Sequence, residues 1–161
     1  MKDSYSDPLK KLSLSDPIHL MALGFGSGLS PKAPGTVGTI VAVPVVSLMH
    51  IFTIPVYVIL TILAAAGGVY ICSKASEALG KHDHQAIVWD EFVGFMVACI
   101  ALPVGLSWLF GAFLLFRLLD IFKPWPISWI DKKVKGGWGI MLDDIVAGLM
   151  TCAVIQLINF I

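Results

Sequence analysis

The residues of this sequence that could do chemistry are carboxylates in apolar surroundings. Asp90 and Glu91 follow the run "AIVW", Asp143 and Asp144 follow "GIML", and Asp120 lies between these pairs along the chain. Clustered carboxylates offer the hard oxygen ligands that Mg²⁺ prefers, while water and phosphate complete its coordination. These five acids therefore predict a magnesium site, in which Asp90, Glu91, Asp143 and Asp144 are also the candidate catalytic groups.

Ion pairing is the alternative role for these acids. Arg117 and Asp120 are three residues apart, so they would lie on one side of a helix and could pair. We favour the metal site, because single ion pairs would not require five acids. Arg117 and Lys123 then become candidate substrate-binding residues that neutralise charge on a phosphoryl group.

A glycine-rich segment, "GFGSGLSPKAPGTVGT" at residues 24–39, could bind an anion. It has neither the glycine spacing of a dinucleotide fingerprint nor the GK[ST] ending of a Walker loop. Backbone N–H groups of such a loop, leading into a helix that starts near Thr36, form an anion cradle. The alternative is a flexible turn at a membrane interface. The candidate substrate-binding residues of this segment are Ser27, Gly28, Ser30, Lys32 and Thr36.

The segment "KHDHQAIVWDE", residues 81–91, adds titratable groups just before the first acidic pair. Histidine changes charge near neutral pH and is a common metal ligand. His82 and Asp83 are therefore secondary candidates, although paired histidines before a helix are also ordinary surface residues.

The elements that must position these residues belong to a membrane protein. Apolar residues make up 57% of the 161 residues and charged residues only 14%, and the mean hydropathy is +0.86. Soluble domains are about a quarter charged. The zero net charge gives no general attraction to nucleic acid. We expect a polar N-terminal segment, residues 1–16, and a single membrane-embedded domain, residues 17–161.

Three long stretches carry no formal charge: residues 33–73, 92–116 and 145–161. The first has room for two spanning helices, since one needs about 20 residues, and its turn is expected near residues 50–55. Pro103 and Gly105 break the second stretch into a hairpin.

The hairpin comprises helices 85–102 and 106–122, which either span the membrane or form a short, re-entrant pair. The last helix is expected from about residue 140. The predicted fold is therefore an all-α, polytopic membrane bundle with four to five membrane helices.

Basic residues between the hairpin and the last helix indicate the orientation: Arg117, Lys123, Lys132, Lys133 and Lys135. Under the positive-inside rule this side is cytoplasmic, and five crossings place the C-terminus outside. Asp90 and Glu91 are expected about two turns into their helix, and Asp143 and Asp144 at the start of the last one. The acids would then gather just inside the cytoplasmic interface, where unpaired carboxylates are costly.

Four segments resemble the phosphatidylglycerophosphatase A family of bacterial inner-membrane lipid phosphatases. They are "GFGSGLSPKAPGTVGT", "HDHQAIVWDEFVG", "FRLLDIFKPWPI" and "GGWGIMLDDIVAG", in the family's order and spacing. The resemblance implies Mg²⁺-dependent hydrolysis of phosphatidylglycerophosphate to phosphatidylglycerol and inorganic phosphate. The family's polar motif positions fall on Ser27, Ser30, Thr36, Asp83, Asp90, Glu91, Arg117, Asp120, Lys123, Asp143 and Asp144.

The leading interpretation is thus a phosphatase that acts on a phospholipid in the bilayer through metal-activated water, with its oligomeric state left open. The alternative is a small proton- or ion-coupled transporter, whose acids would line a path near the membrane midplane. Such a transporter predicts inverted repeats with broken helices, and neither half of this chain resembles the other. A non-catalytic assembly subunit would not need the five acids.

Overall fold

The computed structural model describes residues 8–81 and 84–161. This described part of the chain is helical and contains no strand, which confirms the predicted all-α class. The α-helices are α1 (Pro17–Ala22), α2 (Pro34–Met49), α3 (Ile54–Leu79), α4 (Trp89–Ala98), α5 (Leu106–Phe122), α6 (Ile127–Lys133) and α7 (Gly136–Phe160). Two 3-10 helices, η1 (Pro8–Lys11) and η2 (Gly24–Leu29), precede α1 and α2.

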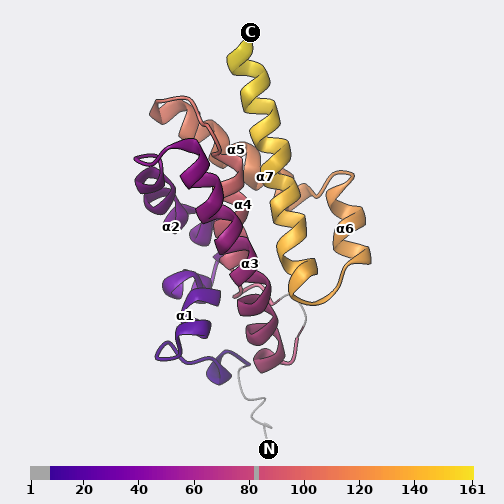
Figure 1. Ribbon diagram of the computed structural model, residues 1–161. Helices are drawn as coiled ribbons and strands as arrows, with labels where there is room; N and C mark the ends of the chain where they lie inside the picture. The colour runs from indigo at the N-terminus through magenta and orange to yellow at the C-terminus, as the bar shows by residue number, and fades with distance from the viewer. Residues whose placement is uncertain (1–7, 82–83) are drawn as a thin grey trace, which may run out of the picture.

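The short helix α4 forms the centre of the bundle, with α2, α3, α5 and α7 packed around it (Figure 1). Every residue of α4 except Glu91 is buried. A helix that is apolar on all sides belongs in such an interior position. The longer α7 also packs along α3, α5 and α6, so α4 and α7 together form the core of the molecule.

The helices α3 and α7, of 26 and 25 residues, are long and apolar enough to cross a membrane, and α2 is apolar but shorter. Large apolar side chains such as Ile62, Leu63 and Phe110 are exposed on α3 and α5. An apolar outer surface of this kind suits contact with lipid rather than water. The structure is therefore compatible with a membrane helical protein in which α3 and α7 are the candidate spans, and the four to five membrane helices expected from the sequence stay a prediction.

The observed helix boundaries correct two expectations. The third predicted helix, residues 85–102, is shortened to α4, so Asp90 and Glu91 lie in its first turn rather than two turns in. The described residues just before α4 form a turn rather than a helix, in which the Ile87 N–H donates to the His84 carbonyl (2.8 Å). The Val88 N–H donates outside its own helix, to the Ala22 carbonyl of α1 (2.9 Å).

The last helix begins at Gly136 rather than near residue 140, so Asp143 and Asp144 lie about two turns inside it. The run "GGWG" is a poor helix former by propensity. However, a Cβ at Gly137 would lie only 2.1 Å from the Val69 carbonyl oxygen of α3. Close packing between α7 and α3 thus requires glycine there and outweighs its low propensity.

The end of α4 leaves backbone carbonyls that no further helical turn satisfies. Side chains from neighbouring helices donate to them instead. The Tyr57 hydroxyl donates to the Met96 carbonyl (2.8 Å), and His50 Nε2 lies 3.0 Å from the Cys99 carbonyl oxygen. Gln156 Nε2 donates to the carbonyls of residues 100 and 101. At membrane depth such partners are necessary, because the bilayer interior offers no water.

The helices α4 and α7 approach each other through a pair of glycines. A Cβ at Gly148 would lie 2.3 Å from the Gly94 carbonyl oxygen, and a Cβ at Gly94 would lie 2.8 Å from the Asp144 carbonyl oxygen. Neither position accepts a side chain without movement of a helix. The two backbones are therefore in direct contact at this level.

Gly148→Ala should destabilise the protein, because the added Cβ would push α7 away from α4. Overpacking of this kind costs about 1–3 kcal/mol, so thermal unfolding in detergent should show a lower Tm. Gly67→Ala on α3 is the matched control: its Cβ would meet nothing within 4 Å, and alanine favours a helix over glycine by about 1 kcal/mol. An unchanged Tm for Gly148→Ala would contradict the close contact.

Candidate active site

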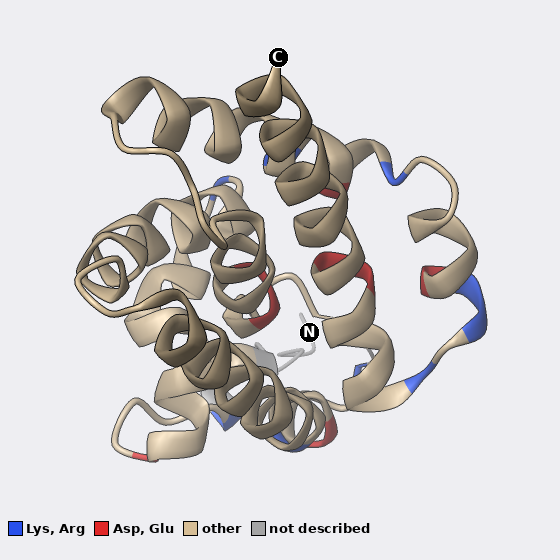
Figure 2. Cartoon of the chain, turned by 45° about the horizontal axis from the view of Figure 1, so that its top comes forward, with Lys and Arg blue, Asp and Glu red and all other residues tan. Residues whose placement is uncertain are grey.

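Three carboxylates meet where α4 and α7 begin to run side by side. Asp90 and Glu91 come from the first turn of α4, and Asp144 comes from α7. One carboxylate oxygen from each lies within 4.8 Å of the others. Figure 2 shows these acidic segments of α4 and α7 facing each other near the middle of the bundle. Asp90 and Asp144 are only 7% and 3% exposed, so their charges are largely removed from bulk water.

The glycine contact explains how these acids come together. Gly94 lies four residues after Asp90, and Gly148 lies four residues after Asp144. Residues four apart are neighbours on one side of a helix. Each carboxylate therefore stands one turn from the glycine that brings the helices close. Neither glycine was predicted from the sequence as a site-building residue, although the D-x-x-x-G spacing occurs at both pairs.

The helix α5 adds Arg117 and Asp120 to the carboxylates. The two side chains form the ion pair that their spacing allows, and Arg117 Nη1 also lies 4.0 Å from Glu91 Oε1. Asp120 is close enough to Asp144 to interact with it electrostatically. Within the described residues, Glu91 Oε2 and Arg117 Nε are buried and have no hydrogen-bond partner. These two atoms are available to a ligand.

Lys123 ties α6 to α7. Its Nζ donates to Asp131 of α6 and to Asp143 of α7, each at 2.7 Å. Partial burial lowers the pKa of the Lys123 ammonium, but the two hydrogen bonds outweigh this and raise the pKa above its usual value. The stabilisation from these two hydrogen bonds, the tie between α6 and α7, is therefore fully present below the pKa of lysine in the unfolded chain, about 10.4. It is lost as the pH rises through the raised pKa of Lys123 in the folded protein. Asp131 was not predicted as a site residue, because the sequence pattern indicated no helix between residue 122 and residue 140, where the structure has α6.

The charge balance of this region favours a bound cation. Arg117 and Lys123 are the cations that ion-pair with these acids in the described chain. They face six carboxylates, from Asp90, Glu91, Asp120, Asp131, Asp143 and Asp144. Buried carboxylates that outnumber their partners repel one another unless a cation joins them or protons neutralise them. The oxygen-only donor set of Asp90, Glu91 and Asp144 fits Mg²⁺.

The glycine-rich segment reaches the acids at the start of α2. A Cβ at Gly35 would lie 2.1 Å from Glu91 Oε1 and 3.2 Å from Arg117 Nη2. Gly35 and Thr36 occupy the first turn of α2, whose N–H groups have no partner within a helix. These N–H groups and the helix dipole favour an anion beside Arg117. Gly35 was not among the predicted site residues, although it lies in the quoted motif.

The earlier part of the segment has its own internal bonds. Ser27 Oγ donates to the Gly24 carbonyl (2.7 Å), and Ser30 Oγ donates to the Lys32 carbonyl (2.9 Å). A Cβ at Gly28 would lie 2.0 Å from the Ala86 carbonyl oxygen. A larger side chain at residue 28 would therefore clash with the backbone, whether or not this segment binds a substrate. The Lys32 side chain is exposed.

The structure thus brings Asp90, Glu91 and Asp144 together, places Arg117, Asp120 and the backbone of Gly35 beside them, and links Asp143 to Lys123. Thr36 follows Gly35 in the first turn of α2. Ser27, Ser30 and Lys32 show no recorded bond to this cluster in the described part of the chain. His82 and Asp83 lie outside the described residues.

Comparisons with known proteins agree with the motifs. Residues 20–159 match the family model of phosphatidylglycerophosphatase A. The phosphatidylglycerophosphatase A of Escherichia coli strain K12 is 46% identical over 150 residues, which cover 92% of this chain and 87% of that protein. The Haemophilus influenzae protein of the same name is 44% identical over 160 residues, which cover 96% of each chain. No solved structure matches. The chain therefore belongs to the phosphatidylglycerophosphatase A family.

Proposed function

We propose that this protein hydrolyses phosphatidylglycerophosphate to phosphatidylglycerol and inorganic phosphate, with Mg²⁺ as its cofactor. The observation that carries the proposal is the carboxylate cluster of Asp90, Glu91 and Asp144, which lies beside Arg117 and the start of α2. Metal-assisted hydrolysis of a phosphate ester requires a cation site next to a site that binds the phosphate anion. The family's name supplies the identity of the lipid.

The chain's own groups suit in-line attack of water on phosphorus. The first-turn N–H groups of α2 and the Arg117 guanidinium hold the phosphoryl oxygens and stabilise their developing charge. Glu91 Oε2 accepts the proton of the attacking water, while the bond from phosphorus to the glycerol oxygen breaks. That oxygen takes up a proton from solvent water and leaves as the alcohol, and Glu91 then returns its own proton to the solvent. Mg²⁺, held by Asp90, Glu91 and Asp144, supplies Lewis acidity at this site when bound.

We further propose a multi-pass arrangement in the bacterial inner membrane with the carboxylates facing the cytoplasm. Lys123, Lys132, Lys133 and Lys135 lie on the segment that joins α5 to α7, near the acids, whereas the α2–α3 turn at residues 50–53 carries no formal charge. The positive-inside rule then orients the bundle. Single cysteines at residues 133 and 53 should be labelled from the cytoplasm and from outside, respectively, and the reverse pattern would overturn the orientation.

Phosphate release by purified protein in detergent tests the activity directly. Phosphatidylglycerophosphate should be hydrolysed with Mg²⁺, and EDTA should abolish the reaction. Asp144→Asn keeps the side chain's size but removes a charge, so kcat should fall by about 10²-fold or more, as for loss of a group that stabilises transition-state charge. Undiminished turnover in EDTA would contradict the metal requirement. Full activity of Asp144→Asn would remove Asp144 from the site.

Lys123 is proposed to contact the phosphate as well as to tie α6 to α7, because an ammonium has three donors and only two are used. Lys123→Met should therefore lower kcat/KM by about tenfold, or 1.4 kcal/mol. Asp131→Asn weakens the tie while the ammonium remains, so it should lower kcat/KM less. Lys132→Met, at an exposed position of α6, is the control. Equal losses for Lys123→Met and Asp131→Asn would assign Lys123 to the tie alone.

A further inference from the structure

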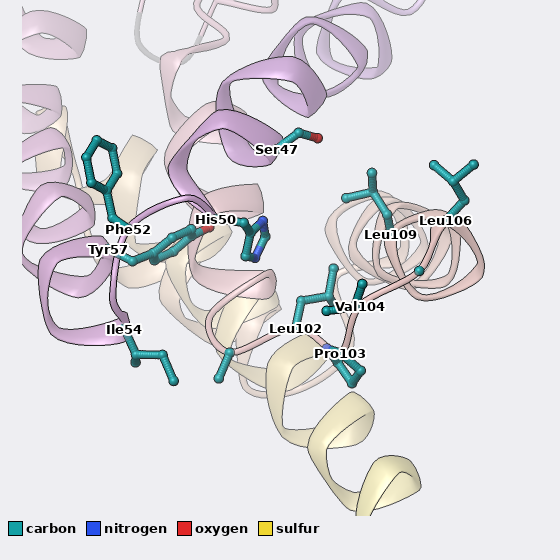
Figure 3. Close-up of a pocket in the computed structure, with 12 residues that line it drawn as sticks. Ser47, His50, Phe52, Ile54, Tyr57, Leu102, Pro103, Val104, Leu106 and Leu109 are labelled. Atoms are coloured by element: carbon teal, nitrogen blue, oxygen red, sulfur yellow. The ribbon is translucent and has the colours of Figure 1, made fainter.

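A cavity of about 560 Å³ lies at the end of the bundle away from the carboxylates. It is enclosed by the α2–α3 turn, the connection from α4 to α5, and the first turns of α5 (Figure 3). Its volume is typical of small-ligand sites, which measure about 300–1,000 Å³. Most of its lining is apolar and includes Phe52, Leu102, Val104, Leu106 and Leu109.

The polar side chains that line this cavity each already make a hydrogen bond to a backbone carbonyl. Ser47 Oγ donates to the Val43 carbonyl of its own helix (2.8 Å). His50 and Tyr57 bond to the carbonyls at the end of α4. In Figure 3 the His50 and Tyr57 rings lie next to each other at the cavity, and their centroids are 5.2 Å apart. A polar solute would therefore find few hydrogen-bond partners in this cavity. A hydrocarbon needs no hydrogen bonds and would lose nothing by binding here.

Two helices connect this cavity to the carboxylates. α2 runs from Gly35, beside Glu91, to Ser47 at the cavity, and α5 runs from Leu109 at the cavity to Arg117, beside Glu91. At 1.5 Å per residue these paths measure roughly 18 Å and 12 Å. The hydrocarbon of one leaflet is about 15 Å deep, half of a core of about 30 Å. An acyl chain long enough to cross one leaflet therefore matches the distance from the proposed headgroup site to the cavity.

The helices α2 and α5 flank α4 between the two sites. Both α2 and α5 pack against α4, and neither has the other as a major packing partner. An elongated molecule with an anionic head and a hydrocarbon tail would match both ends, with the head at Arg117 and the tail at Leu109. We propose that this cavity binds the end of one acyl chain of the lipid substrate. This inference rests on the proposed function.

The test compares substrates with long and short chains. Leu109→Trp fills the cavity with a larger side chain at a position that does not touch the headgroup site. The kcat/KM for dipalmitoyl phosphatidylglycerophosphate should fall about tenfold, the effect of roughly two methylene groups losing their burial. The kcat/KM for the dihexanoyl substrate should stay within about twofold of wild type, because its chains are too short to reach the cavity.

Leu114→Trp is the matched control, since Leu114 lies on α5, is exposed and does not line the cavity. Both substrates should retain their kcat/KM in this variant. Equal losses on the two substrates in Leu109→Trp, or no loss on either, would overturn the assignment. If wild-type protein released phosphate from neither substrate, the proposed function would fail instead.

A second measurement needs neither turnover nor a variant. Wild-type protein is irradiated with phosphatidylglycerol that carries a diazirine at the end of one chain, and the labelled peptides are identified by mass spectrometry. Labelling should concentrate on residues 47–57 and 101–109. Labelling spread over the exposed faces of α3 and α7, with none at the cavity, would show ordinary bilayer contact or another occupant and would overturn the inference.

Discussion

The direct contact between α4 and α7 at Gly94 and Gly148 is the constraint on which the rest of the structure depends. It allows two helices to approach so closely that carboxylates one turn away come within 4.8 Å of each other. Carboxylates this close and this buried repel strongly unless a cation joins them. Favourable packing between the two helix backbones therefore holds together carboxylates that their mutual repulsion would otherwise drive apart. The same concentration of negative charge would bind a divalent cation, which would cancel the repulsion.

The short length of α4 gives the bundle two chemically different ends. At its first turn the acids meet Arg117 and the start of α2, which together suit a cation and a phosphate. At its last turn, side chains such as Tyr57 and His50 bond the free carbonyls and leave a largely apolar cavity. A phospholipid has the same two-part character, since its headgroup lies at the interface while its chains lie in the hydrocarbon. The two ends of the bundle thus match the two parts of a phospholipid in polarity.

The sequence predicted the helical class, the turn at residues 50–53 and the limits of α5, because long uncharged runs and the breaks at Pro103 and Gly105 are local signals. It did not predict where α4 and α7 begin, because contacts with distant segments decide both boundaries. The Val88 N–H bonds to Ala22, and Gly137 packs on Val69. Asp131 and Gly35 were missed for the same reason. Their significance arises only when α6 and α2 are folded against the site.

The central claim is that helix packing builds a cation site, and Mn²⁺ binding followed by electron paramagnetic resonance tests it most directly. Mn²⁺ prefers the same oxygen ligands as Mg²⁺, so its signal reports the site in purified protein without substrate. We expect wild-type protein to bind Mn²⁺ and to release it when Mg²⁺ is added. Gly148→Ala, which removes no carboxylate, should weaken binding by about tenfold or more, because it separates Asp144 from Asp90 and Glu91. Absence of Mn²⁺ binding to wild-type protein, or unchanged binding to folded Gly148→Ala protein, would contradict the account.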